Sequence, residues 1–125
     1  MKKSGKDNQN LGRFGEDKAV DYLISAGYTV LQRNFRCRLG EIDIIAQKDG
    51  FIAFIEVKLR KNSSYGTAAE FVGNAKQRRI LLTAEFFLNS AAVLGQPRFD
   101  VIEIYAPYGE NGALQINHIE DAFGC

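Results

Sequence analysis

The chain is poor in the side chains on which many metal sites and nucleophilic enzymes depend. Its 125 residues include one histidine, His118, and two cysteines, Cys37 and Cys125, which lie far apart in the sequence. These are too few ligands for a structural zinc site, and the cysteines form no CxxC redox pair. A Ser-His-Asp or Cys-His centre would have to use His118, which lies in a strand-like stretch without a partner motif. The sequence therefore argues against structural zinc and against histidine-driven catalysis.

Long apolar segments are absent as well. The longest unbroken apolar run is the five residues Phe51–Ile55, far short of the roughly 20 residues that a membrane-spanning helix needs. Residues 1–10 are basic and polar and lack the apolar stretch of a secretion signal. We therefore expect no membrane contact, a cytoplasmic location and cysteines that stay reduced.

The remaining composition is that of an ordinary globular domain. A chain of 125 residues matches one domain and is long enough to fold without disulfide or metal staples. We expect a disordered polar tail over residues 1–10 and a single domain over residues 11–125. Residues 1–90 carry 15 Lys and Arg against 10 Asp and Glu, whereas residues 91–125 carry one against five. Only residues 1–90 carry an excess of positive charge with which to face a polyanion. An ordinary solvated surface explains an excess of this size as well.

Apolar periodicity and turn residues predict the order helix, three strands, helix, strand and a short edge strand. The first helix is expected from about Leu11 to Ala26, because Gly27 is a natural helix stop. A long second helix ends near Ser90, and it begins at Thr67–Glu70, which resembles a capping box, or several residues later. The expected strands cover residues 28–35, 40–47, 51–60, 98–106 and 114–119. This order is typical of an α/β sandwich with a central mixed sheet flanked by helices.

The second and third strands are predicted to form a hairpin. They are joined by Asp49-Gly50, and both positions of an Asp-Gly turn tolerate a positive φ. A slip by one residue would set apolar against polar side chains, so the apolar pattern resists it. The opposed pairs are then Lys48–Phe51, Ile44–Ile55 and Ile42–Val57, the last two on one apolar face.

On the other face of this hairpin two acids oppose each other. The register sets Asp43 opposite Glu56, and Glu41 opposite Lys58. Directly opposed side chains have Cβ atoms about 4.5–5.5 Å apart, where like charges are destabilising. Asp43 and Glu56 therefore need a shared proton or a bound cation such as Mg²⁺, unless the sheet edge is exposed and water screens them. The opposition of Glu41 and Lys58 is explained by a simple cross-strand ion pair, which leaves open a chemical role for Lys58.

The first helix supplies a third acid. Glu16 shares a helical face with Ala19 and Leu23 and is therefore placed to look into the molecule. A glutamate at such a boundary often reaches back to water, so its position alone is a weak signal. Asp100 alternates with Ile102 along its strand and is interpreted as an inward-pointing structural residue.

The second helix supplies positive charge. Lys76 and Gln77 begin an apolar stripe that continues at Ile80, so they lie at the end of the face that packs on the sheet. With Arg78 and Arg79 next to them, they are candidates to contact a phosphate backbone. A solvated basic turn explains the same spacing equally well.

The ordered set of Glu16, GEID, EVKLR, AKQRR and RFDV resembles the PD-(D/E)xK nuclease superfamily. Its closer resemblance is to the small uncharacterised bacterial YraN-like family, from GRFGEDKAVDYL to RFDVIEI. The acids are also arranged as in archaeal Holliday junction resolvases. The resemblance implies a restriction-endonuclease-like αβββαβ core. The sequence departs from the superfamily pattern at Ile42, which stands where proline precedes the aspartate.

The resemblance also implies roles for individual residues. Asp43 and Glu56 would bind one or two Mg²⁺ or Mn²⁺ ions, helped by the backbone carbonyl of Val57. Lys58 would orient or activate the attacking water and offset charge on the phosphate, and Glu16 would complete the acidic cluster. The residues implied to contact nucleic acid or support the site are Arg60, Lys76 and Gln77.

These features favour a divalent-metal-dependent endonuclease that acts on DNA rather than RNA, with a branched or damaged structure as a candidate substrate. Phosphodiester cleavage needs a metal, an activated water and charge stabilisation, and the acids with Lys58 provide these parts. Two other interpretations stay open: a catalytically weak nucleic-acid-binding or adaptor module, and a structural module whose acids satisfy one another. No base-reading motif is visible, so we expect a homodimer or a partner protein to help bind the substrate.

Overall fold

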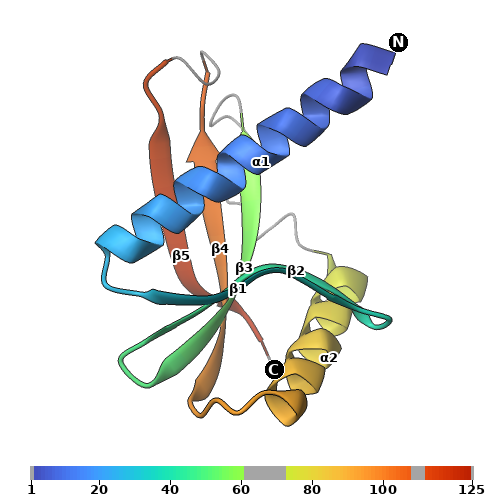
Figure 1. Ribbon diagram of the computed structural model, residues 1–125, viewed down its shortest axis with the longest axis vertical. Coiled ribbons are helices and arrows are strands. Elements are labelled where there is room, and N and C mark those ends of the chain that lie inside the picture. The colour runs from blue at the N-terminus through green and yellow to red at the C-terminus, as the bar shows by residue number, and fades with distance from the viewer. Residues whose placement is uncertain (1, 61–72, 108–111, 125) are drawn as a thin grey trace.

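The computed structural model describes residues 2–60, 73–107 and 112–124, with the side chains of the first helix described from Gly12 onward. The elements, shown in Figure 1, are α1 (Lys2–Ser25), β1 (Thr29–Cys37), β2 (Gly40–Lys48), β3 (Phe51–Arg60), α2 (Asn74–Ser90), β4 (Gln96–Tyr105) and β5 (Gln115–Phe123). The predicted order of elements is confirmed. In the described part of the chain, neither helix is long and apolar enough to cross a membrane.

The five strands form one mixed sheet in the order β1-β2-β3-β4-β5. All neighbouring strands are antiparallel except β3 and β4, which run parallel. A parallel pair requires a crossover connection, and α2 lies within it. The predicted α/β architecture is therefore confirmed, and it is compatible with a restriction-endonuclease-like fold.

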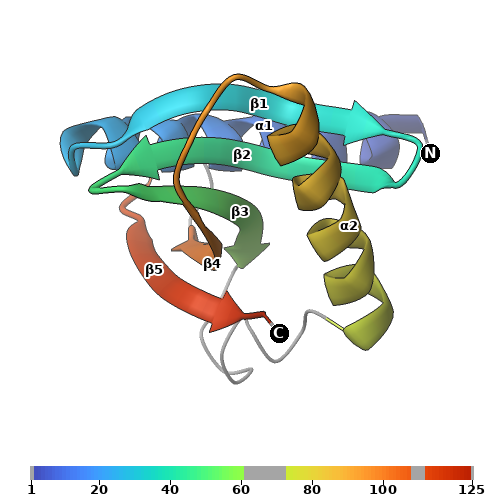
Figure 2. The ribbon, with the colours of Figure 1, turned by 90° about the horizontal axis from the view of Figure 1, so that it is seen from below.

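Each helix buries one face of the sheet. Ile52 and Phe54 of β3 pack in the core that contains α2, whereas the alternating Ala53 and Ile55 pack in the core that contains α1. Because successive residues of a strand point to opposite faces, the helices lie on opposite sides, as Figure 2 shows. A strand buried on both faces needs apolar residues at every position, which explains the unbroken run of β3.

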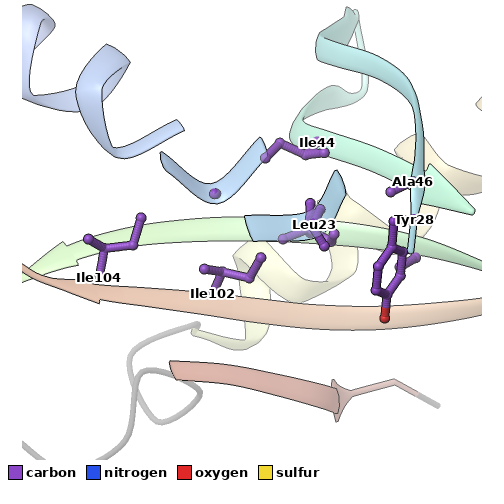
Figure 3. Close-up of a cluster of buried hydrophobic side chains, with 9 residues drawn as sticks. Leu23, Tyr28, Ile44, Ala46, Ile102 and Ile104 are labelled. Carbon is purple, nitrogen blue, oxygen red and sulfur yellow. The ribbon is translucent and has the colours of Figure 1, made fainter. Parts of the chain in front are cut away.

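The core beneath α1 is built from Leu23 and isoleucines of β2, β3 and β4. Figure 3 shows Leu23 among Ile44 of β2 and Ile102 and Ile104 of β4, and all four side chains are fully buried. Truncating a residue of this kind to alanine typically costs about 2–5 kcal/mol. This packing fixes the position of α1 on the sheet.

The end of α1 is as predicted, but its beginning is not. Gly27 has a φ of 95°, its N–H donates to Ile24, and the N–H of Tyr28 donates to Leu23. These two hydrogen bonds form a Schellman motif, which requires a residue of left-handed conformation. The helix begins at Lys2 rather than at about Leu11. Residues 2–10 contain no proline, the residue that most strongly disfavours a helix interior.

The start of the second helix agrees with the later of the two expected positions, whereas the end of the last strand differs from expectation. Helix α2 begins at Asn74 with Gly73 as its N-cap, and Thr67–Glu70 lies outside the described residues. Strand β5 continues to Phe123 instead of ending at Ile119. It does so through an irregularity at Asp121, which has a φ of 54° and whose N–H donates to Asp100. A polar pair, Glu120-Asp121, thus interrupts the apolar pattern without ending the strand.

Candidate functional site

The candidate site forms where strands β2 and β3 separate. The predicted register is confirmed from Lys48–Phe51 to Ile44–Ile55, but the ladder ends there. Beyond this point β2 pairs only with β1, and β3 pairs only with β4. The expected cross-strand pairs Ile42–Val57, Asp43–Glu56 and Glu41–Lys58 are therefore not formed, because each strand follows its outer neighbour.

A local twist at Asp43 accompanies this separation. Ile42 belongs to the core that contains α2, whereas Ile44 belongs to the core that contains α1. The expected single apolar face with both residues is therefore wrong. Asn34 of β1, opposite Asp43 in the register, has a φ of 51°, a conformation that asparagine tolerates better than most residues. The side chain of Asp43 instead reaches β3, where its Oδ2 accepts a hydrogen bond of 2.8 Å from the N–H of Val57.

Three acids from three elements meet in this gap. The acid cavity, as we call it, has a volume of about 290 Å³. Glu16 comes from α1, Asp43 from β2 and Glu56 from β3, and the Nδ2 of Asn34 holds the carboxylate of Glu16 at 3.1 Å. The described residues that line the cavity are Gly12, Glu16, Glu41, Asp43, Glu56, Val57, Leu59 and Lys76.

The two central acids differ in how their charges are compensated. Burial and the negative charges of Glu56 and Glu16 raise the pKa of Asp43 to about 7, against the lowering effect of the Val57 N–H. Glu56 is buried but forms ion pairs with two lysines, a direct hydrogen bond from Lys76 Nζ and a contact of 3.5 Å with Lys58 Nζ. Among the described residues no lysine is paired with Asp43, so the ionised form of this carboxyl group is disfavoured, whereas that of Glu56 is compensated.

The donor set suits a hard divalent cation. Mg²⁺ is commonly held by one or two carboxylates together with waters and substrate phosphates, rather than by an all-protein cage. In the described part of the chain no three His, Cys, Asp or Glu side chains form a ready-made metal cage. Asp43 and Glu56 provide two carboxylates, and the ammonium of Lys76 now neutralises one of them. Two carboxylates beside a cavity are a donor set that fits a magnesium-type site.

The other predicted residues lie at varying distances from the acids. Lys58 contacts Glu56, as described above. The first turn of α2 carries Gln77, which is not among the described residues lining the acid cavity. The Nε of Arg60 lies 4.0 Å from the buried Glu103, also outside that lining. Glu41 pairs with Arg36 of β1 at 3.4 Å instead of with Lys58, because β2 follows β1 here.

A second cavity, of about 400 Å³, adjoins the acid cavity; we call it the basic groove. The turn between β1 and β2 lies beside α2 in Figures 1 and 2, and arginines from both form its walls. Its charged lining residues are Arg36, Arg38, Glu41, Lys76 and Arg79. Sequence reasoning singled out Lys76 and Arg79 but missed Arg36 and Arg38. The close spacing of arginines in RNFRCR was the available signal.

His118 has partners that the sequence did not reveal. Its Nε2 lies 2.8 Å from Asp100 Oδ2, and its Nδ1 lies 2.9 Å from the hydroxyl of Tyr22. Asp100 is fully buried, as its alternation predicted, and also accepts two hydrogen bonds from Arg98. This network lies in the core beneath α1, on the face opposite Glu56, and ties α1 and β5 to the sheet. It is a structural cluster separate from the acid cavity.

Comparison with known proteins assigns the chain to a family. The model of the uncharacterised protein family UPF0102 matches residues 15–104. A UPF0102 protein of Caldicellulosiruptor bescii is 50% identical over 119 residues, which cover 92% of this chain and 98% of the relative. A UPF0102 protein of Clostridium perfringens is 44% identical over 119 residues, covering 94% of this chain and 97% of the relative. The matched range contains the three acids and both lysines of the site.

Proposed function

The chain belongs to the uncharacterised protein family UPF0102, and from this premise we propose that it is a divalent-metal-dependent endonuclease acting on DNA. The observation that carries the proposal is the meeting of Glu16, Asp43 and Glu56 beside Lys58, where β2 and β3 separate. The family match agrees with the resemblance to YraN-like proteins. The wider relation to PD-(D/E)xK nucleases is part of the proposal.

Asp43 and Glu56 are the residues proposed to hold Mg²⁺ or Mn²⁺, with the carbonyl of Val57. A bound divalent cation supplies Lewis-acid polarisation of the phosphate and a water of lowered pKa. The raised pKa of Asp43 supports this assignment, because burial and the neighbouring acids disfavour its ionised form, which a bound cation would stabilise. Glu16, held by Asn34, adds negative charge to the same cavity.

Lys58 and Lys76 are proposed to offset the negative charge of the substrate. Lys58 Nζ lies 3.5 Å from Glu56 Oε2, so it is placed to orient a water beside that carboxylate and to offset charge developing on the phosphate. Lys76 contacts Glu56 directly and also lines the basic groove. It can therefore leave Glu56 for a substrate phosphate when a metal takes its place.

One observation favours a second candidate, a nucleic-acid-binding or adaptor module with weak or no cleavage. Lys76 already compensates Glu56 without a metal, so the acids and lysines can satisfy one another. In that case the fold and the basic groove remain useful for binding alone. The homodimer or partner protein expected from the sequence stays a prediction in either case.

Cleavage assays separate these candidates. Wild-type protein is incubated with labelled linear, nicked, flapped and four-way-junction DNA, and with RNA, in Mg²⁺ or Mn²⁺. The proposal requires cutting of DNA that both Glu56→Ala and Lys58→Ala reduce at least about 100-fold, the scale of losing one charge-stabilising group. Arg78→Ala, an exposed neighbour on α2 that lines neither cavity, is the matched control. No cutting, or cutting that survives in the two active-site variants, rejects the nuclease proposal.

A further inference from the structure

The basic groove carries positive charge that the protein does not use internally. Arg38 and Arg79 are both exposed, and neither forms an ion pair with any residue that the structure describes. The other two cations are engaged, Arg36 with Glu41 and Lys76 with Glu56. Two unengaged guanidinium groups on facing elements, the β1–β2 turn and α2, form a site for an external anion.

The basic groove continues into the acid cavity. Glu41 and Lys76 line both of them. A third cavity, of about 560 Å³, shares Glu16 with the acid cavity and Arg36 with the basic groove, and Arg13 also lines it. The three cavities therefore adjoin one another around the acids, and we call them together the track; arginines line the basic groove and the third cavity. A track of this kind suits a polyanion with regularly spaced charges better than a small anion.

The residues that line the track indicate which groups of the polyanion the protein contacts. None of the described residues that line the three cavities is aromatic. Surfaces that bind single-stranded nucleic acid usually combine a basic groove with aromatic side chains on which bases stack. Contacts restricted to phosphates suit a duplex, which carries one negative charge per about 1.7 Å of its axis and hides its bases.

We propose that the basic groove binds the backbone of duplex DNA without reading its sequence, through Arg38 and Arg79, and so sets a backbone phosphate beside the acid cavity. This inference rests on the proposed function for the identity of the substrate. It adds the binding surface, the preference for duplex over single strands and the independence of sequence. Lys76, at the boundary of groove and acid cavity, marks where the backbone reaches the acids.

Binding is measured without cleavage, on the full chain in EDTA. The probe is a fluorescein-labelled duplex of about 20 base pairs, followed by anisotropy between about 50 and 200 mM KCl. Arg38→Ala and Arg79→Ala are each expected to weaken binding at least about 3-fold and to reduce the salt slope by about one. The matched control, Arg78→Ala, is expected to change the affinity less than about 2-fold. Thermal unfolding of all variants checks that they fold, which their exposed side chains lead us to expect.

Further probes test the mode of recognition. Three duplexes of unrelated sequence are expected to bind within about 3-fold of one another, and each more tightly than its separated strands. Tighter binding of single strands, or a strong preference for one sequence, overturns the inference. It is also overturned if Arg38→Ala and Arg79→Ala change binding no more than Arg78→Ala.

The two proposals fail in different ways. If duplex binding depends on Arg38 and Arg79 but the DNA is never cut, the binding inference stands and the nuclease proposal fails. If cutting depends on Glu56 and Lys58 while the two arginine variants bind and cut like wild type, the nuclease proposal stands and the binding inference fails.

Discussion

At the scale of single residues, Asp43 and Glu56 differ in how their negative charges are compensated. Asp43 has acids as neighbours, and its pKa is raised to about 7. Glu56 has two lysines. From the sequence alone the two carboxylates looked equivalent, because a register that sets them opposite each other does not reveal the charges that Lys76 and Glu16 bring to the cavity. The two residues should therefore respond differently to loss of charge.

Asp43→Asn is expected to stabilise the metal-free protein at neutral and alkaline pH. Between about pH 4 and 7 the folded state holds a proton that the unfolded chain has lost, so wild-type stability falls as pH rises. Above pH 7 the penalty is complete, at most about 4 kcal/mol for a shift of this size. Urea unfolding in EDTA from pH 4 to 8.5 measures this, and the gain of the variant should grow with pH and level off.

Glu56→Gln is the comparison for this experiment. It removes the partner of Lys76 and Lys58 and is expected to destabilise the protein, unlike Asp43→Asn. If Asp43→Asn raises the free energy of unfolding equally at every pH, or lowers it at pH 8, then Asp43 is not the carboxylate whose ionised form is disfavoured in the folded protein.

Lys76→Gln is expected to tighten metal binding. The ammonium of Lys76 bonds the Glu56 carboxylate that the metal needs, so removing it removes a competitor. Titration calorimetry with Mn²⁺ should show affinity about 3- to 10-fold higher than that of wild type, about one kcal/mol. Arg78→Gln is the control with the same loss of charge on the same helix. Weaker Mn²⁺ binding by Lys76→Gln would contradict the exchange of lysine for metal.

At the scale of elements, the network around Asp100 anchors α1 and β5. Asp100→Asn is expected to cost about 3 kcal/mol, because Arg98 and His118 lose a buried ionised partner. Asp121→Asn is the control, since asparagine suits its φ of 54° and leaves in place the backbone N–H that bonds Asp100. Urea unfolding at pH 7 compares the two variants, and an equal small effect would contradict the anchoring role.

The same network has a pH dependence with a known sign. Burial raises the pKa of Asp100, but hydrogen bonds from His118, Arg98 and the Asp121 N–H outweigh burial and lower it. The stabilisation is therefore present above about pH 4 and is lost as pH falls through the folded pKa. Asp100→Asn should remove this acid-induced loss, whereas Asp121→Asn should retain it.

Residues that act within a short stretch of sequence predicted the elements well, whereas features that depend on contacts between distant segments were not predicted. Gly27 and Asp49-Gly50 act through their own backbone conformation, so the helix end and the hairpin register follow from sequence. The separation of β2 from β3 depends on the pairing of each with a third strand, which no local pattern records. The positive φ of Asn34, which accompanies the twist at Asp43, left no sequence signature either.

At the scale of the whole molecule, the sheet separates two tasks. The face beneath α1 holds one apolar core and the Asp100 network, and the face beneath α2 holds a second apolar core. The acids of α1, β2 and β3 meet where β2 and β3 separate, next to the basic groove. Sequence reasoning found the acids, because they follow a recognisable motif order. It missed the groove, because Arg38 and Arg79 are 41 positions apart and meet only when the β1–β2 turn reaches α2. The near-neutral net charge therefore conceals a locally cationic surface.

The most direct test of the central claim, that the acid cavity binds a divalent cation through Asp43, is the melting temperature with and without metal. Wild-type protein in about 10 mM Mg²⁺ or about 1 mM Mn²⁺ should melt a few degrees higher than in EDTA, because a ligand that binds only the folded state stabilises it. Asp43→Ala should show almost no shift, and Arg78→Ala should shift like wild type. Equal shifts in wild type and Asp43→Ala would contradict the site described here.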